Sequence, residues 1–227
     1  MNPEPLTVPP QLASWDRAGH PSQVRLAEFL THVETVAARQ VAGVEGRLAM
    51  ELVVGLPEGT SLATGGRDLD NYLYPVAQRL GAIRLAAAFG RKTHGPSSLA
   101  IGPVQPDPDA VAARFVTRMA GSYERDEWKQ ALHDRLLQQY TTAVASGPLK
   151  MVLALTTGGQ RNWANLWKPL VDAFGPVLGE DPHWQFHPND DRIVDLAMHH
   201  SVDAALGHDV VVEAWWTDAS APPYGVP

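Results

Sequence analysis

The feature that most constrains the fold is a short pattern that the chain carries twice. Glycine, leucine, methionine and leucine recur at identical spacing in Gly46-Arg47-Leu48-Ala49-Met50-Glu51-Leu52 and Gly147-Pro148-Leu149-Lys150-Met151-Val152-Leu153. In both stretches the large apolar residues alternate with other residues, as in a β-strand that buries one face. Because an internal repeat indicates a duplicated structural unit, we predict an α+β chain made of two related halves.

A second shared stretch differs in charge between its copies. Arg67, Asn71 and Pro75 recur with the same spacing, and the two aspartates between them are replaced by neutral residues; the copies read Thr64-Gly65-Gly66-Arg67-Asp68-Leu69-Asp70-Asn71-Tyr72-Leu73-Tyr74-Pro75 and Thr157-Gly158-Gly159-Gln160-Arg161-Asn162-Trp163-Ala164-Asn165-Leu166-Trp167-Lys168-Pro169. Asp68 and Asp70 correspond to Asn162 and Ala164. The chain therefore holds one charged copy and one neutral copy of this stretch.

Periodicity and turn residues predict helix-strand-helix-strand-strand in each half. The predicted segments are a proline-rich arm (1–21), a first half (22–104), a linker with a short helix at 110–119 (105–123), a second half (124–217) and a tail (218–227). In the first half we expect a helix from 22 that ends at Gly43, a strand at 48–54, a helix from 70 or 71 to 80, and strands at 83–89 and 97–101. In the second half we expect helices at 126–145 and 165–174 and strands at 149–155, 192–199 and 210–216.

Composition excludes several classes of function. The chain has no cysteine, which rules out disulfides, thiolate catalysis and cysteine zinc sites. No apolar run is long enough to cross a bilayer, and the N-terminus lacks a signal peptide, so we expect a cytoplasmic protein. A net charge of −7 argues against a protein that coats nucleic acid. It remains compatible with a nuclease whose carboxylates hold cations.

Two acidic pairs are candidate metal ligands. Asp68 and Asp70 lie at the start of a predicted helix, and two carboxylates there would repel one another unless a cation such as Mg²⁺ lay between them. The alternative is that one of them caps the helix. Asp190 and Asp191 precede a predicted strand, where the alternative is a solvated turn.

Histidines and tryptophans gather in the second half. The histidines could bind zinc, although those at 183 and 187 are flanked by prolines and those at 199 and 200 must point to opposite faces of a strand. The tryptophans could stack on bases or pack in the core. The residues concerned are His183, His187, His199, His200, His208, Trp163, Trp167, Trp215 and Trp216.

These motifs resemble those of the RusA-like Holliday-junction resolvases, which carry an Asp-x-Asp-Asn-x-x-Lys helix start and an Asp-Asp pair that opens the next strand. The first half matches through Asp68-Leu69-Asp70-Asn71, with Tyr74 in the place of the lysine. The second half matches through Asn165-Leu166-Trp167-Lys168 and Asp190-Asp191, without the two metal aspartates. The resemblance implies a dimeric endonuclease that cuts branched DNA with Mg²⁺ or Mn²⁺. It further implies that aspartates hold the metal and that the lysine lies near the scissile phosphate.

Each half lacks part of the family's site, which leaves three hypotheses. In the first, the chain is an intrachain pseudo-dimer whose halves pool Asp68, Asp70, Asp190 or Asp191, and Lys168 into one composite site. In the second, both sites are inactive and the fold binds nucleic acid or a protein partner. The third is a hydrolase that uses the C-terminal histidines and aspartates. The first hypothesis requires the two acidic pairs to lie close together.

Overall fold

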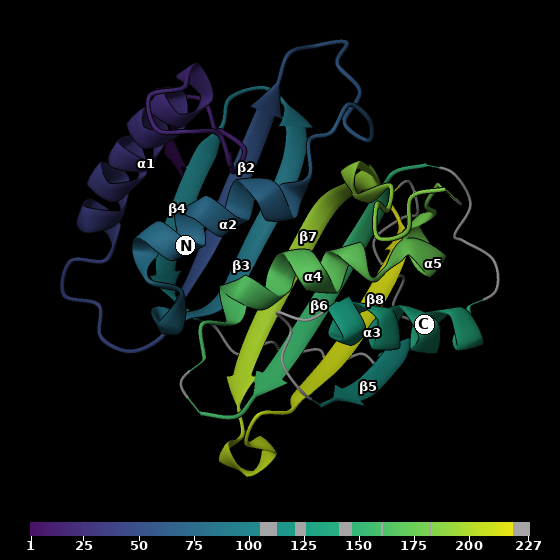
Figure 1. The fold of residues 1–227 in the computed structure, drawn as a ribbon. Helices are drawn as coiled ribbons and strands as arrows, with labels where there is room; N and C mark the ends of the chain where they lie inside the picture. The colour runs from purple at the N-terminus through teal and green to yellow at the C-terminus, as the bar shows by residue number, and fades with distance from the viewer. Residues whose placement is uncertain (105–112, 121–125, 141–146, 160, 182, 220–227) are drawn as a thin grey trace, which may run out of the picture.

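The computed structural model describes residues 1–104, 113–120, 126–140, 147–159, 161–181 and 183–219. Within these ranges the chain is a mixed α+β structure built on one eight-stranded sheet, with the strand order β1-β4-β2-β3-β7-β6-β8-β5 (Figure 1). The strands are β1 (Glu4–Pro5), β2 (Leu48–Leu56), β3 (Leu85–His94), β4 (Ser98–Pro103), β5 (Phe115–Met119), β6 (Leu149–Thr157), β7 (Ile193–Val202) and β8 (Val210–Asp218).

The helices cover one face of this sheet (Figure 1). They are α1 (Pro21–Gln40), α2 (Leu69–Leu80), α3 (Asp126–Gln139), α4 (Trp167–Asp172) and α5 (Gly175–Leu178). Alternate residues of β2 and β6, such as Met50 and Leu153, are fully buried beneath the helices. Among the described residues, no helix is long and apolar enough to span a membrane.

The strand pairing is the same in each half of the sheet. β2 runs parallel to β3 and antiparallel to β4, while β6 runs parallel to β7 and antiparallel to β8. The register shifts once at the start of each parallel pair, between Leu48 and Ala49 and between Leu149 and Lys150. β3 and β7 pair antiparallel at the centre, so both trios of strands belong to one continuous sheet.

Most predicted elements are confirmed within a few residues. The first helix, the repeated strands β2 and β6 and the strand pair at the C-terminal end lie where the periodicity placed them. α2 ends at Gly81, whose φ of 83° is in the left-handed region that glycine tolerates. The predicted arm is ordered, since β1 pairs with β4 and the Ala13 N–H donates to the Asn71 carbonyl over 2.8 Å.

Three predictions of local structure need correction. The predicted helix at 110–119 is wrong in its described part, because Phe115–Met119 forms strand β5 against β8 and buries both of its terminal residues. The predicted helix at 165–174 is divided into a 3₁₀ turn (Trp163–Leu166), α4 and α5. β3 extends through His94, beyond the end of the strand predicted at 83–89. The linker segment 105–112, the helix end predicted at 141–145 and the tail residues 220–227 lie outside the described residues.

A buried histidine on β7 connects β6 with the residue that precedes β2. His200 stacks on Trp163 with ring centroids 5.0 Å apart. Its Nδ1 accepts from Arg47 Nη2 over 2.7 Å, which leaves Nε2 to donate to Thr157 Oγ1 over 2.9 Å. Burial, followed by the nearby Arg47 charge, lowers the pKa of His200 to about 4. The neutral imidazole is therefore part of the folded structure at neutral pH.

We expect His200 to make the fold sensitive to mild acid. Its pKa is lower in the folded chain than in the unfolded chain, so only the unfolded chain takes up this proton between about pH 6.5 and pH 4. Stability should fall by on the order of 2–3 kcal/mol across that window. Unfolding of wild type and of His200→Gln at pH 7 and pH 4.5 measures this, with the less buried His199→Gln as control. An equal pH-dependent loss in all three proteins would contradict the expectation.

Candidate active site

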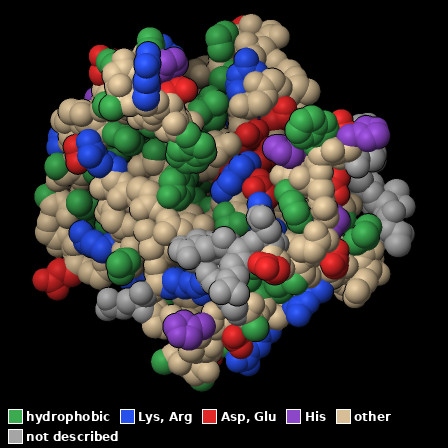
Figure 2. Space-filling view, in the orientation of Figure 1, with side chains coloured by type: hydrophobic (Ala, Val, Ile, Leu, Met, Phe, Trp, Pro, Cys, Tyr) green, Lys and Arg blue, Asp and Glu red, His purple; other side chains and the backbone are tan. Residues whose placement is uncertain are grey.

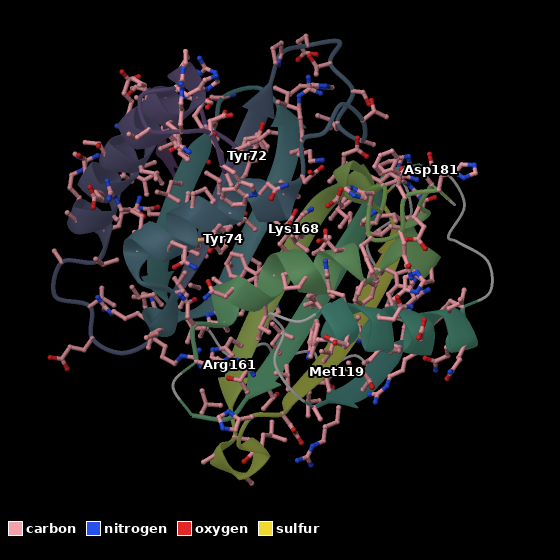
Figure 3. All side chains as sticks on the ribbon, viewed as in Figure 1. Tyr72, Tyr74, Met119, Arg161, Lys168 and Asp181 are labelled. Atoms are coloured by element: carbon pink, nitrogen blue, oxygen red, sulfur yellow. The ribbon has the colours of Figure 1, made fainter. Side chains whose placement is uncertain are left out.

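Three of the four aspartates singled out in the sequence, Asp68, Asp70 and Asp190, meet around Lys168, where the start of α2, helix α4 and the segment before β7 converge. Figure 3 shows Lys168 between α2 and α4, beside Tyr74. The Lys168 ammonium lies 3.0 Å from Asp190 Oδ2 and 3.9 Å from Asp70 Oδ2. One carboxylate from each acidic pair thus lies within reach of the same ammonium group, which is the proximity that the composite-site hypothesis requires.

Asp70 is a buried carboxylate whose negative charge is little compensated by hydrogen bonds. It lies in the first turn of α2 with 2% of its surface exposed, and its Oδ2 accepts no hydrogen bond from the described residues. Burial raises the pKa of Asp70 to about 7, while the Lys168 charge opposes this rise. Holding this side chain ionised at neutral pH therefore costs the fold free energy, as expected of a group that receives a cation from solution.

Asp68 occupies the N-cap position of α2 without capping the helix through its side chain. Its Oδ2 instead accepts a hydrogen bond from Asn71 Nδ2 over 3.0 Å. Burial and then the Asp190 charge raise the pKa of Asp68 to about 6. Asp68 thus stands at the cap position of the helix but lacks the side-chain bond of a capping residue.

Asp190 and Asp191 belong to a 3₁₀ turn (Asp190–Arg192) that leads into β7. Asp190 is buried against Lys168, which excludes a solvated turn at this residue. Asp191 Oδ2 accepts from the Gly66 N–H over 3.2 Å, and its carbonyl accepts from Lys92 Nζ over 2.6 Å. Hydrogen bonds therefore join this turn directly to the loop before α2 and to strand β3.

The positive charge of Lys168 is stabilised by the carboxylates that surround it. Burial alone would lower its pKa, but the carboxylates of Asp70, Asp190 and Asp172 outweigh burial and raise the pKa above the usual lysine range. The Asp172 contact is 3.0 Å and spans one turn of α4. The ammonium is thus charged throughout the physiological range and held in a fixed position among three carboxylates.

Two of these charged residues were not predicted as site residues from the sequence. Lys92 is buried on β3, and burial lowers its pKa to about 8 despite the attraction of Asp68. Its inward position follows from the alternation of β3, in which Ala88, Gly90 and Lys92 share the buried face. Asp172 could have been found from its i,i+4 spacing to Lys168 on a helix.

The neutral copy of the motif forms an amide network instead of a charged cluster. Asn162 Nδ2 donates to Gln78 Oε1 over 3.0 Å, and Gln78 Nε2 donates to Asn165 Oδ1 over 2.8 Å. The Tyr74 hydroxyl donates to the same Asn165 oxygen over 3.3 Å. Ala164 lies in the core and offers no ligand. This network links α2 to the segment before α4 without any ionisable carboxylate.

The remaining motifs do not form sites. Trp163 and Trp167 are completely buried and Trp216 nearly so, which confirms the core interpretation for these three rings, while Trp215 is half-buried. His199 and His200 point to opposite faces of β7, as predicted, with His199 against Phe89 on the face away from the helices. In the described ranges, no group of three or more histidine, aspartate or glutamate side chains is arranged to hold a metal ion.

The charged cluster nevertheless offers suitable chemistry for a hard cation. Mg²⁺ takes oxygen ligands, keeps several waters and is commonly bound by one or two carboxylates rather than by a complete protein cage. Asp68 provides a half-buried carboxylate and Asp70 a buried one, and Asp70 Oδ2 accepts no hydrogen bond from the described residues. These residues fit Mg²⁺ or Mn²⁺ as partial ligands, with water completing the coordination.

The charged cluster lies toward the middle of the face covered by helices. Figure 2 shows acidic and basic side chains gathered there, next to hydrophobic ones. Comparison of the chain with protein-family models, with curated proteins and with solved structures found no match.

Proposed function

We propose that the protein is a RusA-like, Mg²⁺-dependent endonuclease that acts on branched DNA and has a single composite active site. The observation that carries the proposal is the approach of Asp70 and Asp190, from opposite ends of the chain, to within 3.9 Å and 3.0 Å of the same Lys168 ammonium. Carboxylates with strongly shifted pKa values cluster at functional sites, and a metal ion held by such groups can offset phosphate charge.

We further propose that the two halves form an intrachain pseudo-dimer. Its support is the repeated strand pairing around the central β3–β7 contact, together with the matched sequence motifs. In this view the charged cluster is the retained site, and the amide network of Asn162, Gln78 and Asn165 is its degenerate counterpart. One site can cut one strand at a time, so a product nicked in a single strand is expected from each encounter.

Each residue of the cluster has a distinct role in this proposal. Asp68 and Asp70 would hold the cation, with Asp190 beside them. When bound, Mg²⁺ supplies a Lewis acid that activates water and offsets phosphate charge. Lys168 presents its ammonium to the scissile phosphate, and Asp172 and Asp190 keep that ammonium charged and in position. Lys92 fixes the Asp191 backbone, so it acts as a positioning residue.

The composite site predicts that a carboxylate of the second half is required as much as those of the first. Asp190→Asn should lower the rate of cleavage of four-way junction or flap DNA by about 100-fold or more, since it removes a charge that positions Lys168. Radiolabelled or fluorescent DNA incubated with enzyme and Mg²⁺ or Mn²⁺ gives the rate. The matched control is Asp181→Asn, an exposed aspartate outside the cluster.

The outcomes separate the proposal from its alternatives. Loss of cleavage in Asp190→Asn with retention in Asp181→Asn supports the composite site. Absence of cleavage of both substrates by the wild-type protein with either metal excludes the nuclease activity. Full activity in Asp190→Asn excludes a contribution of the second-half carboxylate.

One observation favours a second candidate, an inactive module that binds nucleic acid or a protein partner. Lys168 already makes ion pairs with three carboxylates, so part of the negative charge of the cluster is balanced without any metal. The net charge of −7 also weakens binding to a polyanion. A gel-shift titration with branched DNA at rising salt distinguishes the two partners, because affinity for DNA falls steeply with salt concentration.

A further inference from the structure

A cavity adjoins the charged cluster and is not accounted for by metal or phosphate binding. Its volume is about 280 Å³, and it lies between α2 and the segment that leads into α4. Its lining residues are Trp15, Asp70, Asn71, Tyr74, Ala164, Asn165 and Lys168. This volume lies just below the ~300–1,000 Å³ of typical small-molecule sites, so the cavity suits one planar ring system rather than an extended ligand.

Trp15 gives this cavity an aromatic wall. The side chain comes from the N-terminal arm, is 79% exposed and meets Tyr74 edge-on with ring centroids 6.4 Å apart. A second hollow of about 340 Å³ is also lined by Trp15 and Tyr74, so the pair separates two open spaces. An exposed indole in this position is available for stacking, in contrast to the buried Trp163 and Trp167.

The arm holds Trp15 at the site through a specific contact. The Ala13 N–H donates to the carbonyl of Asn71, whose side chain in turn donates to Asp68. Trp15 is therefore tied to the same helix turn that carries the two candidate metal ligands. At the floor of the cavity lies Asp70, a buried carboxylate whose Oδ2 accepts no hydrogen bond from the described residues. The cavity thus combines an aromatic wall with an unsatisfied polar group.

We propose that this cavity binds one unpaired nucleobase of a branched DNA substrate, stacked on Trp15 and placed beside the scissile phosphate. The inference rests on the proposed nuclease function and adds to it the feature of DNA that is recognised. Every nucleobase has a π-face, so stacking on an indole tolerates any sequence and selects an unstacked base over a paired one. The side-chain amide of Asn71 and the Tyr74 ring line the same space and can contact the edge of the base.

The test compares binding to two DNA duplexes that differ in one group. Both contain a single-nucleotide bulge; one has an adenine there and the other an abasic residue. Binding is measured by fluorescence anisotropy in Ca²⁺ and, separately, in EDTA. Wild type should bind the adenine bulge about 5–100-fold more tightly than the abasic one, and Trp15→Ala should abolish that preference.

Two further variants serve as controls, one for the stability of the fold and one for the loss of an exposed aromatic ring elsewhere. Trp15→Phe should retain most of the preference, since a phenyl ring can still stack. Trp184→Ala removes another exposed tryptophan, 64% exposed and outside the cavity, and should leave the preference unchanged. Equal affinity of wild type for the two bulges, absence of binding to either, or an unchanged preference in Trp15→Ala would each overturn the inference.

The result is distinguishable from failure of the nuclease proposal. If the protein cleaves no DNA but shows a base preference that depends on Trp15, the base-binding site is supported and the nuclease activity is excluded. Cleavage that depends on Asp190, with no difference between the two bulges, supports the enzyme and overturns the base site.

Discussion

Replacing Asp70 with asparagine is expected to abolish DNA cleavage and at the same time to stabilise the fold at neutral and alkaline pH. Cleavage should fall by at least about 100-fold, because a candidate cation ligand is lost. Stability should rise because Asp70 is ionised at high pH in a buried position, and the neutral amide avoids this cost. Opposite effects on activity and stability are a mark of a functional site.

The pH dependence of this effect follows from the raised pKa. The folded chain holds the Asp70 proton up to about pH 7, whereas the unfolded chain loses it near pH 4. The contribution of this group to stability therefore declines as pH rises from about 4 to about 7. Relative to wild type, Asp70→Asn should gain little at pH 4.5 and on the order of 2 kcal/mol at pH 8.

Denaturant unfolding of wild type, Asp70→Asn and Asp181→Asn at these two pH values checks the expectation. Addition of 10 mM Mg²⁺ or Mn²⁺ at pH 8, a concentration of roughly 10–100 times a millimolar to submillimolar Kd, should raise the Tm of wild type but not that of Asp70→Asn. This measurement reports cation binding without relying on activity. A variant that is less stable than wild type at pH 8 would show that the Asp70 charge is well compensated in the fold.

Replacing Lys168 with methionine is expected to cause the largest loss of stability at the site. The change removes the one ammonium that pairs with Asp70, Asp172 and Asp190. Breaking a buried ion pair costs about 3–5 kcal/mol, and because the Lys168 side chain is 43% exposed we expect about 1–3 kcal/mol at pH 7.5. Cleavage should be lost together with stability.

The loss of stability in Lys168→Met should be smaller in acid, because a protonated carboxyl group is neutral and no longer forms an ion pair with the ammonium. Urea unfolding at pH 5 and pH 7.5 provides the comparison. Lys168→Arg preserves the charge and should retain most of the stability, and Lys150→Met, on the sheet face away from the helices, should change little. If Lys168→Met unfolds at the same urea concentration as wild type at both pH values, the ion pairs contribute nothing to the fold.

Much of the fold followed from local pattern. The alternation of Leu48, Met50 and Leu52 and its repeat at 149–153 correctly predicted two equivalent strands, because burying one face of a strand imposes a period of two residues. Gly81 ended α2 as expected from its tolerance of a left-handed φ. The segment at Phe115 was mistaken for a helix, because its short apolar spacing fits both periods and only pairing with β8 decides between them.

Part of the candidate site could also be predicted from the sequence. Asp68, Asp70, Asp190 and Asp191 could be singled out from their spacing, and Lys168 from the resemblance to the RusA-like motif. Lys92 gave a signal only through strand alternation, and Trp15 gave none, since it stands in a proline-rich arm without periodicity. A residue in such a segment acquires a role through what it lies against, and sequence spacing carries no such information.

The sequence by itself determined an α+β chain with a repeated strand pattern, and that one copy of the second motif is charged while the other is neutral. The tertiary structure decided that the charges of the two copies meet. Antiparallel pairing of β3 with β7 places the start of α2 beside α4 and the turn before β7, so Asp70 and Asp190 share Lys168. The physical reason is that a carboxylate's burial and its distance from a cation depend on contacts between distant segments, which local sequence pattern does not encode.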